Sequence, residues 1–258
     1  IEGAGKAFVA GADIKFFIDN IEAGRIPKIA DFARRGQEVL RKLETSAKPV
    51  IAKVDGLSLG GGTELALACQ AIVATEKAGF GFPETGIGIY PGLGGTQRTA
   101  RIVGKELAKY LVFTGAPLDG KTAHEIGLAA YYVPSAEADA FIRDLVARGA
   151  VADKYAAKPV PAGWEPVVEA FSDDRVGEVL AGKAPNGDPR VQAAAKAILR
   201  KAPLAVRAAN QILDEGMKAD LPAGLELELS RMEEIFATAD ALTGLKSVGV
   251  SRPEFKGV

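Results

Sequence analysis

Apolar residues along the chain form two kinds of pattern, short β-branched runs and longer stretches with helical spacing. The short runs predict buried strands at residues 49–54 and 71–74. The helical spacing predicts helices over residues 31–46, 96–112, 118–127 and 135–149. This mixture of strands and helices in one chain indicates an α/β fold.

One stretch, residues 48–68, joins a predicted strand directly to a predicted helix. Three consecutive glycines, Gly60 to Gly62, follow the apolar run, and a series of strong helix formers begins at Thr63. A tight turn from a strand into a helix leaves backbone N–H groups without partners at the positive end of the helix dipole. The stretch therefore predicts a site for negative charge, either a phosphate or the oxyanion of an attacked or enolised carbonyl.

The residues around these glycines disfavour a phosphate site. No Lys follows them, as a P-loop requires, and no glycine cluster has the Gly-x-Gly-x-x-Gly spacing of a dinucleotide site. Glu64 stands at the start of the helix, where its carboxylate would repel a phosphate. From this stretch alone, Glu64 is either a functional carboxylate or a helix residue stabilised by the dipole.

Two further segments combine small residues with a carboxylate. Residues 10–13 read Ala-Gly-Ala-Asp, which would let a ligand approach the backbone, with Asp13 as a helix cap. Residues 79–96 place glycines among apolar residues, which indicates short strands and turns packed against other parts of the protein. Glu84 lies in this apolar setting, where it is either a proton donor with a raised pKa or a turn carboxylate facing water.

The second half of the chain is predicted to be mostly helical. Residues 151–190 contain scattered prolines and indicate an irregular excursion with short helices around 165–171 and 174–181. From residue 191 the pattern is strongly helical, with breaks at Pro203 and near Pro222. Its apolar stripe favours packing or a subunit interface.

Composition disfavours several classes of function. Of the 258 residues, 48% are hydrophobic and 25% charged, and the net charge is −1, which gives no electrostatic support for a nucleic-acid or membrane partner. The sequence contains no apolar run of about 20 residues, so no membrane span is predicted. His124 is the only histidine and is expected to be structural, so neither a His-based triad nor a metal site is predicted. The single Cys69 cannot form an internal disulfide, which favours a cytoplasmic location.

Eight short motifs occur in order along the chain. They lie at residues 7–15, 54–66, 80–84, 91–98, 111–115, 123–128, 236–240 and 252–257. Together they resemble the crotonase (enoyl-CoA hydratase/isomerase) superfamily, and most closely its enoyl-CoA hydratases. The resemblance covers about residues 1–134 and 191–258.

The resemblance implies a crotonase-like spiral of ββα units over residues 1–190, with an atypical insertion at about 151–190. Residues 191–258 would form a helical C-terminal region that drives assembly of a homotrimer or a dimer of trimers. Residues 1–3 read as the end of a strand, so the early strands of the family are expected to be missing from this chain. Their absence would expose a sheet edge unless another polypeptide supplies them.

The resemblance also implies roles for individual residues. The backbone N–H groups of Ala12 and Gly61 would form an oxyanion hole for the thioester carbonyl. Glu64 would orient and deprotonate water, and Glu84 would supply the α-proton. Other contacts to the acyl-CoA substrate are expected from Ala10, Asp13, Ile14, Lys15, Phe16, Tyr90, Pro91, Gly92 and Lys256. Coenzyme A would enter as part of the substrate, and no permanently bound cofactor is expected.

The expected activity is hydration of trans-2-enoyl-CoA in fatty-acid β-oxidation. A Δ3-Δ2-enoyl-CoA isomerase or another crotonase-type enzyme is the alternative, but the pair of glutamates favours the hydratase, because moving a double bond needs only one carboxylate. A non-catalytic assembly or RNA-binding module on the same fold would call for a lysine-rich face, which the charge balance disfavours. The missing early strands are consistent with a fused or associated 3-hydroxyacyl-CoA dehydrogenase.

Overall fold

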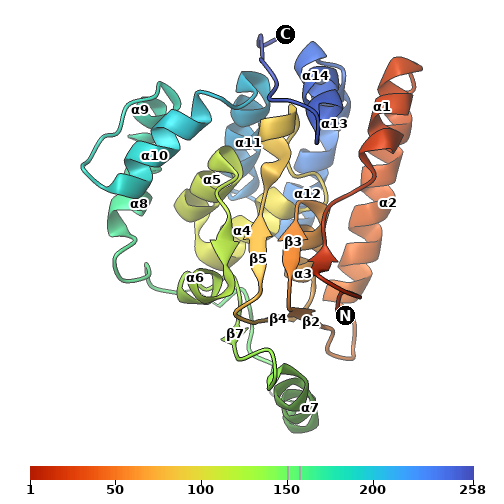
Figure 1. The fold of residues 1–258 in the computed structure, drawn as a ribbon, viewed down its shortest axis with the longest axis vertical. Helices are drawn as coiled ribbons and strands as arrows, with labels where there is room; N and C mark the ends of the chain where they lie inside the picture. Colours follow the sequence, from red (N-terminus) through yellow and green to blue (C-terminus); the bar gives the residue numbers. More distant parts are fainter. Residues whose placement is uncertain (150, 157) are drawn as a thin grey trace.

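Two small sheets form the centre of the computed structural model, which describes residues 1–149, 151–156 and 158–258 (Figure 1). One sheet has the order β1 (Ala7–Val9), β3 (Leu57–Leu59), β5 (Gly79–Gly81) and β6 (Leu118–Asp119). The other has the order β2 (Ile51–Val54), β4 (Ala71–Ala74) and β7 (Tyr131–Tyr132). Neighbouring strands run parallel, except for the antiparallel pair β5 and β6.

The chain winds through the two sheets in a repeating order. β2 and β3 lead into helix α3 (Gly61–Ala68), and β4 and β5 lead through the 3₁₀ helix η1 (Pro83–Ile87) into α4 (Gly95–Val103). Each turn thus adds one strand to each sheet, so that β2 pairs with β4 and β3 with β5. This arrangement confirms the expected α/β spiral of ββα units.

Helices surround the sheets and make up the two ends of the molecule. The N-terminal part contributes α1 (Ile14–Glu22) and α2 (Ile26–Glu44). The middle of the chain contributes α5 (Lys105–Thr114), α6 (Gly120–Glu125), α7 (Ala138–Arg148), α8 (Glu165–Ala170) and α9 (Val176–Leu180). The C-terminal part contributes α10 (Pro189–Ile198), α11 (Pro203–Gly216), α12 (Leu221–Ser230), α13 (Met232–Phe236) and α14 (Ala239–Ser247).

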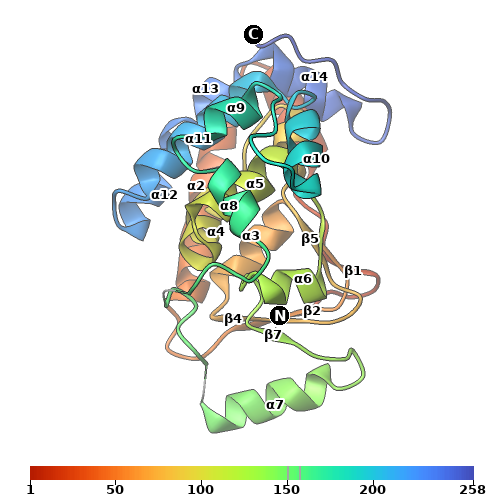
Figure 2. The same cartoon turned by 90° about the vertical axis from the view of Figure 1, so that its left-hand side faces the viewer.

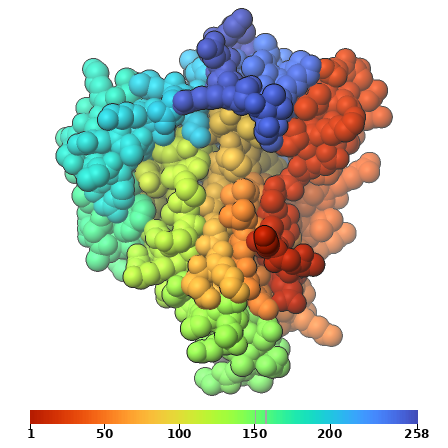
Figure 3. Space-filling model, in the orientation of Figure 1, coloured from red at the N-terminus to blue at the C-terminus, as the bar shows by residue number. Residues whose placement is uncertain are grey.

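The C-terminus lies at one end of the molecule, whereas the N-terminus lies beside β2, where the amino group of Ile1 donates to the backbone oxygen of Ile51 at 2.8 Å (Figure 1). Helix α7 lies at the opposite end, below the sheets in Figures 1 and 2. The C-terminal segment, dark blue in Figure 3, lies close to the N-terminal helix α1, which contacts α14. None of the described helices has both the length and the apolarity needed to cross a membrane.

Several element boundaries differ from the sequence predictions. The helix predicted over residues 96–112 is two helices, α4 and α5, separated at Gly104, whose φ of 93° is a conformation that side-chain-bearing residues rarely adopt. The segment 118–127 starts as strand β6 before it becomes α6. Helix α3 begins at Gly61 instead of Thr63, and the short strand β3 precedes it.

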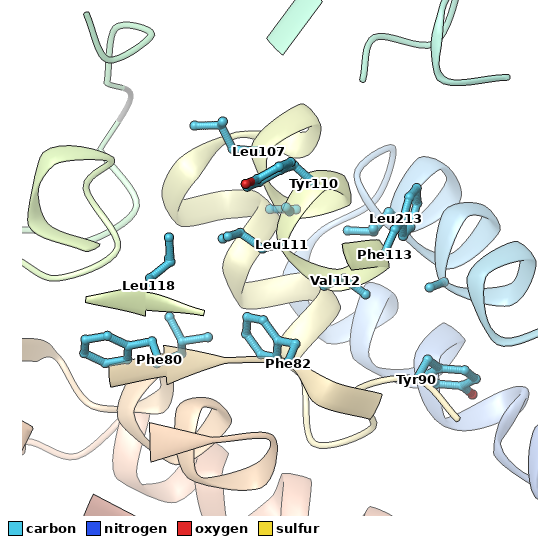
Figure 4. Close-up of a cluster of buried hydrophobic side chains, with 14 of the residues drawn as sticks. Phe80, Phe82, Tyr90, Leu107, Tyr110, Leu111, Val112, Phe113, Leu118 and Leu213 are labelled. Carbon is cyan, nitrogen blue, oxygen red and sulfur yellow. The ribbon is translucent and has the colours of Figure 1, made fainter. Parts of the chain in front are cut away.

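The excursion over residues 151–190 packs against the rest of the protein. The two short helices predicted in it are confirmed as α8 and α9. Trp164 and Phe171 are buried against Tyr110 of α5, with ring centroids 5.9 and 5.6 Å from the tyrosine ring. Figure 4 shows the neighbouring part of this core, where side chains from β5, α5 and β6 such as Phe80, Leu111 and Leu118 gather.

The start of α3 packs tightly against the end of β1. A Cβ atom built on Gly62 would lie 1.9 Å from the backbone oxygen of Val9. A methyl group therefore cannot be placed there without moving the backbone, so glycine is required at this position by space and not by its backbone dihedral angles.

We expect Gly62→Ala to lower the free energy of unfolding by about 2–4 kcal/mol, because the backbone of β1 must move away from α3. Gly177→Ala is the matched control, since a Cβ at Gly177 in helix α9 would meet nothing within 4 Å. That control should be neutral or stabilise the protein by about 0.5 kcal/mol. Urea denaturation of the two variants measures both effects, and equal stability of the two would contradict the prediction.

Candidate active site

A cavity of about 320 Å³ lies where the start of α3 meets η1 and the loop before α1. It is lined by four of the predicted functional residues, Ala12, Gly61, Glu64 and Glu84. Much of the remaining wall is apolar and includes Phe17, Ile29, Phe32, Tyr90, Met232 and Phe236. A concave, mostly apolar space with a few converging polar groups is typical of a small-molecule site.

Two backbone amides of the cavity wall have no protein partner. Within the described part of the chain, neither the Ala12 nor the Gly61 N–H donates a hydrogen bond to another protein group. Gly61 is the first residue of α3, where the helix leaves its amides free and its dipole is positive. Gly11, with a φ of 99°, brings the loop carrying Ala12 beside β3. The two amides are therefore available to a carbonyl oxygen in the cavity.

Glu64 is held by the turn that precedes α4. Its side chain is buried, and its Oε1 accepts hydrogen bonds from the backbone N–H groups of Leu93 and Gly95, both at 2.7 Å. Burial raises the pKa of this carboxyl to about 7, although the two amide donors lower it. Oε2 makes no hydrogen bond with a described residue, so this oxygen can accept a hydrogen bond from a molecule in the cavity.

Glu84 is buried like Glu64 but differs from it in hydrogen bonding. It lies in η1 and is 7% exposed, and its Oε2 is buried without a hydrogen-bond partner among the described residues. A Cβ on Gly60 would be 2.6 Å from Oε1 of Glu84, which places the carboxyl group against the backbone at the start of α3. Burial, and then the charge of Glu64, hold the pKa of Glu84 well above its usual range. A carboxyl group that keeps its proton at neutral pH can act as an acid.

The other predicted substrate contacts divide into two groups. Ala10, Ile14, Tyr90 and Gly92 line the cavity. The cavity wall does not include Asp13, Lys15, Phe16, Pro91 or Lys256.

Those five residues have identifiable roles or positions elsewhere. Asp13 caps α1 by accepting from the Lys15 N–H at 2.9 Å, and the Lys15 side chain pairs with Asp19 at the surface. Phe16 packs against the rings of Phe17 and Phe32, and Pro91 is buried. The backbone N–H of Lys256 donates to Asp240 at 2.7 Å. Their contact with a substrate stays a prediction.

The sequence interpretation missed a third buried carboxylate, Glu228 of α12, which is 0% exposed. Its position was detectable in principle, because Glu228 lies at helical spacing between Leu225 and Met232, on the apolar face of its segment. A charged residue on a buried face needs partners, and these come from the turn at residues 92–96.

Arg98 was also missed, and it ties the same turn to a distant part of the chain. Its fully buried guanidinium donates to the backbone oxygen of Leu93 at 3.0 Å and pairs with Glu44 at 3.0 Å. Glu44 pairs in addition with Lys154, at 2.8 Å, and accepts a hydrogen bond from the Tyr155 hydroxyl. We call Glu44, Arg98, Lys154 and Tyr155 the Glu44 cluster.

A second cavity, of about 420 Å³, is lined by Cys69 and His124 and lacks the paired carboxylates. Nδ1 of His124 lies 3.1 Å from the backbone oxygen of Ala129, at hydrogen-bond distance, as a structural histidine would. Burial raises the pKa of the Cys69 thiol to about 11, which makes it a poor nucleophile.

Comparison with known proteins shows which family this chain resembles over most of its length. A family model described as "Enoyl-CoA hydratase/isomerase" matches residues 1–256. A crotonyl-CoA hydratase of Syntrophomonas wolfei is 35% identical over 95% of this chain and 74% of its own length. A short-chain-enoyl-CoA hydratase of Clostridium acetobutylicum is 34% identical over 93% of this chain and 72% of its own.

A solved structure of an enoyl-CoA hydratase from Rhodobacter sphaeroides superimposes with a TM-score of 0.82. It is 26% identical in sequence, and the match covers 98% of this chain and 76% of that one. The fold seen here is thus shared with a hydratase of known structure.

We expect the raised pKa of Glu64 to make stability fall between about pH 4.5 and pH 7. In this window the folded protein keeps the Glu64 proton, while the unfolded chain, with the ordinary value of 4.5, has lost it. The difference between the two pKa values corresponds to about 3 kcal/mol, and the loss is complete above the folded value. Glu64→Gln cannot titrate but keeps an oxygen for the amides of Leu93 and Gly95.

Urea denaturation at pH 5 and pH 8 should therefore show Glu64→Gln gaining stability over the wild type as pH rises, by up to about 3 kcal/mol. Glu226→Gln is the control, because Glu226 is exposed and pairs with Arg34 at the surface. An unchanged gap between Glu64→Gln and the wild type at the two pH values would contradict the assignment.

Proposed function

Because the chain belongs to the enoyl-CoA hydratase/isomerase family, we propose that it adds water across the trans-2 double bond of enoyl-CoA thioesters. The observation that carries the proposal is the pair of buried glutamates, Glu64 and Glu84, in one cavity with two backbone amides that donate to no other described residue. The names of the relatives support the same reaction.

The proposed reaction uses each of these groups once. The thioester carbonyl oxygen accepts from the N–H groups of Ala12 and Gly61, which stabilise the negative charge of the enolate. Oε2 of Glu64 takes a proton from water as the hydroxyl group adds to Cβ. Glu84 delivers its proton to Cα, which restores the carbonyl, and the two glutamates exchange roles in dehydration.

The different environments of the two carboxyl groups support this division of labour. Glu64 receives two amide hydrogen bonds, which favour its ionised form, whereas Glu84 has an oxygen with no partner among the described residues, which favours its protonated form. A base and an acid are thus present together near neutral pH, as hydration requires.

We expect Glu84→Gln to lower hydration of crotonyl-CoA by at least about 100-fold, because the amide cannot donate a proton to Cα. Glu64→Gln should cause a comparable loss, since its amide cannot deprotonate water. Loss of enoyl-thioester absorbance measures both, with Glu226→Gln as the control that keeps wild-type activity.

A double-bond isomerase would behave differently in the same series. Moving a double bond from the 3 to the 2 position transfers a proton without adding water, so isomerisation of a 3-enoyl-CoA would survive Glu64→Gln but not Glu84→Gln. Wild-type protein that isomerises but does not hydrate would overturn the proposal in favour of the isomerase. Absence of both turnover and CoA binding would favour a non-catalytic module.

We also propose that the substrate carries a short acyl chain. The cavity has only about 320 Å³, and the rings of Phe17, Phe32 and Phe236 meet in its wall with centroid separations of 5.2 to 5.8 Å. The two relatives compared above carry names that refer to crotonyl and short-chain substrates.

Initial rates should therefore show kcat/KM for crotonyl-CoA exceeding that for trans-2-decenoyl-CoA by about tenfold or more, because the longer chain must displace the ring cluster. Equal values for the two substrates would contradict the short-chain assignment.

The resemblance extends the proposal to assembly. Residues 191–258 would mediate a homotrimer or a dimer of trimers, and a 3-hydroxyacyl-CoA dehydrogenase would act as a fused or associated partner. Exposed apolar side chains in the last residues, Val248, Val250 and Val258, support a covered surface in this region.

A further inference from the structure

The turn at residues 92–96 binds two carboxylates with four successive backbone amides. The N–H groups of Leu93 and Gly95 donate to Glu64, both at 2.7 Å. The alternate N–H groups, of Gly94 and Thr96, donate to Glu228 at 2.6 and 3.2 Å. The conformation that satisfies Glu228 is thus the same one that presents two donors to Glu64.

Glu228 is surrounded by hydrogen-bond donors. Its Oε1 also accepts from Nε2 of Gln37 at 2.9 Å, and its Oε2 also accepts from the Thr96 hydroxyl. Nε2 of Gln37 lies 3.0 Å from the backbone oxygen of Gly92, so the same amide group holds the beginning of the turn. In its ionised form this carboxyl group can accept from all of these donors at once, which a neutral amide at this position cannot do.

Glu228 reaches the turn from a different part of the chain. It lies on α12, 132 residues after Thr96, and its backbone oxygen accepts from the hydroxyl of Tyr90 at 2.7 Å. Helices α2 and α12 therefore meet at the turn, one with Gln37 and the other with Glu228, while Glu228 itself does not line the cavity.

We infer that Glu228 is a positioning residue for the hydration, because it fixes the turn whose Leu93 and Gly95 amides orient Glu64. The inference rests on the proposed function. It assigns to the C-terminal helical region a part in aligning the group that activates water. A displacement of about 1 Å at a reacting group can lower the rate about 100-fold, so a small relaxation of the turn is enough to be measured.

Two reactions of the same enzyme can distinguish a loss of Glu64 alignment from general damage to the active site. Hydration of crotonyl-CoA needs Glu64 to activate water. Exchange of an α-proton of butanoyl-CoA with solvent deuterium needs only the amides of Ala12 and Gly61 and the carboxyl group of Glu84. In the exchange the ionised form of Glu84 takes a proton from Cα, this proton is replaced on the carboxyl group by a solvent deuteron, and the deuteron returns to Cα, so no water is added.

We expect Glu228→Gln to lower kcat for hydration by about 10- to 100-fold, with KM changed by less than about threefold. The rate of deuterium exchange, measured by mass spectrometry, should change by less than about threefold. Glu226→Gln, which removes a charge two residues earlier on α12, should leave both reactions unchanged because Glu226 is exposed.

Hydration by Glu228→Gln within twofold of the wild type would overturn the inference, and so would an equal loss of both reactions, which would indicate a structural role only. Wild-type protein without hydration would instead overturn the proposed function.

If Glu228→Gln does not fold, Thr96→Val replaces it. That variant removes the hydroxyl that donates to Glu228 and accepts from Nε2 of Gln97, and hydration should fall by about 3- to 10-fold while exchange is retained. Hydration by Thr96→Val at the wild-type rate would overturn the inference.

Discussion

Backbone amides, and not basic side chains, are the main partners of the two carboxyl groups that meet at the turn of residues 92–96. Glu64 and Glu228 together accept from four successive amides where α4 begins, and the positive end of the helix dipole lies at the same place. Arg98 is the only guanidinium bonded to this turn among the described residues, and it contacts a backbone oxygen there. Burial raises the pKa values of both carboxyl groups above those of solvated carboxylates, although the amide hydrogen bonds lower them.

This arrangement explains why the site needs so many close backbone approaches. Gly60, Gly62 and Gly95 each lie where a Cβ would collide with Glu84, Val9 or Glu64. Glycine at these positions lets the carboxyl groups and strand β1 lie close to the starts of α3 and α4. Space is what Gly62 and Gly95 require, whereas Gly60, with a φ of 52°, also requires the backbone freedom of glycine.

Local patterns marked Glu64 and Glu84 as candidates, each beside glycines and apolar residues, but left a structural role open. The resemblance assigned roles to Glu64, Glu84, Ala12 and Gly61; all four line one cavity, and their roles stay a prediction. Glu228 and Arg98 were missed because their partners are remote in sequence, and a helical stripe cannot show which buried charge meets which turn. Strands of two or three residues, such as β3 and β6, escaped prediction because they give too little alternation to detect. The break at Gly104 was missed because a single glycine is tolerated inside many helices.

The Glu44 cluster bears on how cooperatively the protein unfolds. Lys154 lies in the excursion over residues 151–190, and its ammonium group pairs with the Glu44 carboxylate. Glu44 also pairs with Arg98, which binds the turn beside Glu64. Detaching the excursion would leave Glu44 with one cation fewer and would uncover the aromatic contacts of Trp164 and Phe171 with α5. Amide protons of the excursion and of α4 are therefore expected to exchange through one shared opening, so that the excursion behaves thermodynamically as part of the core and not as an appendage.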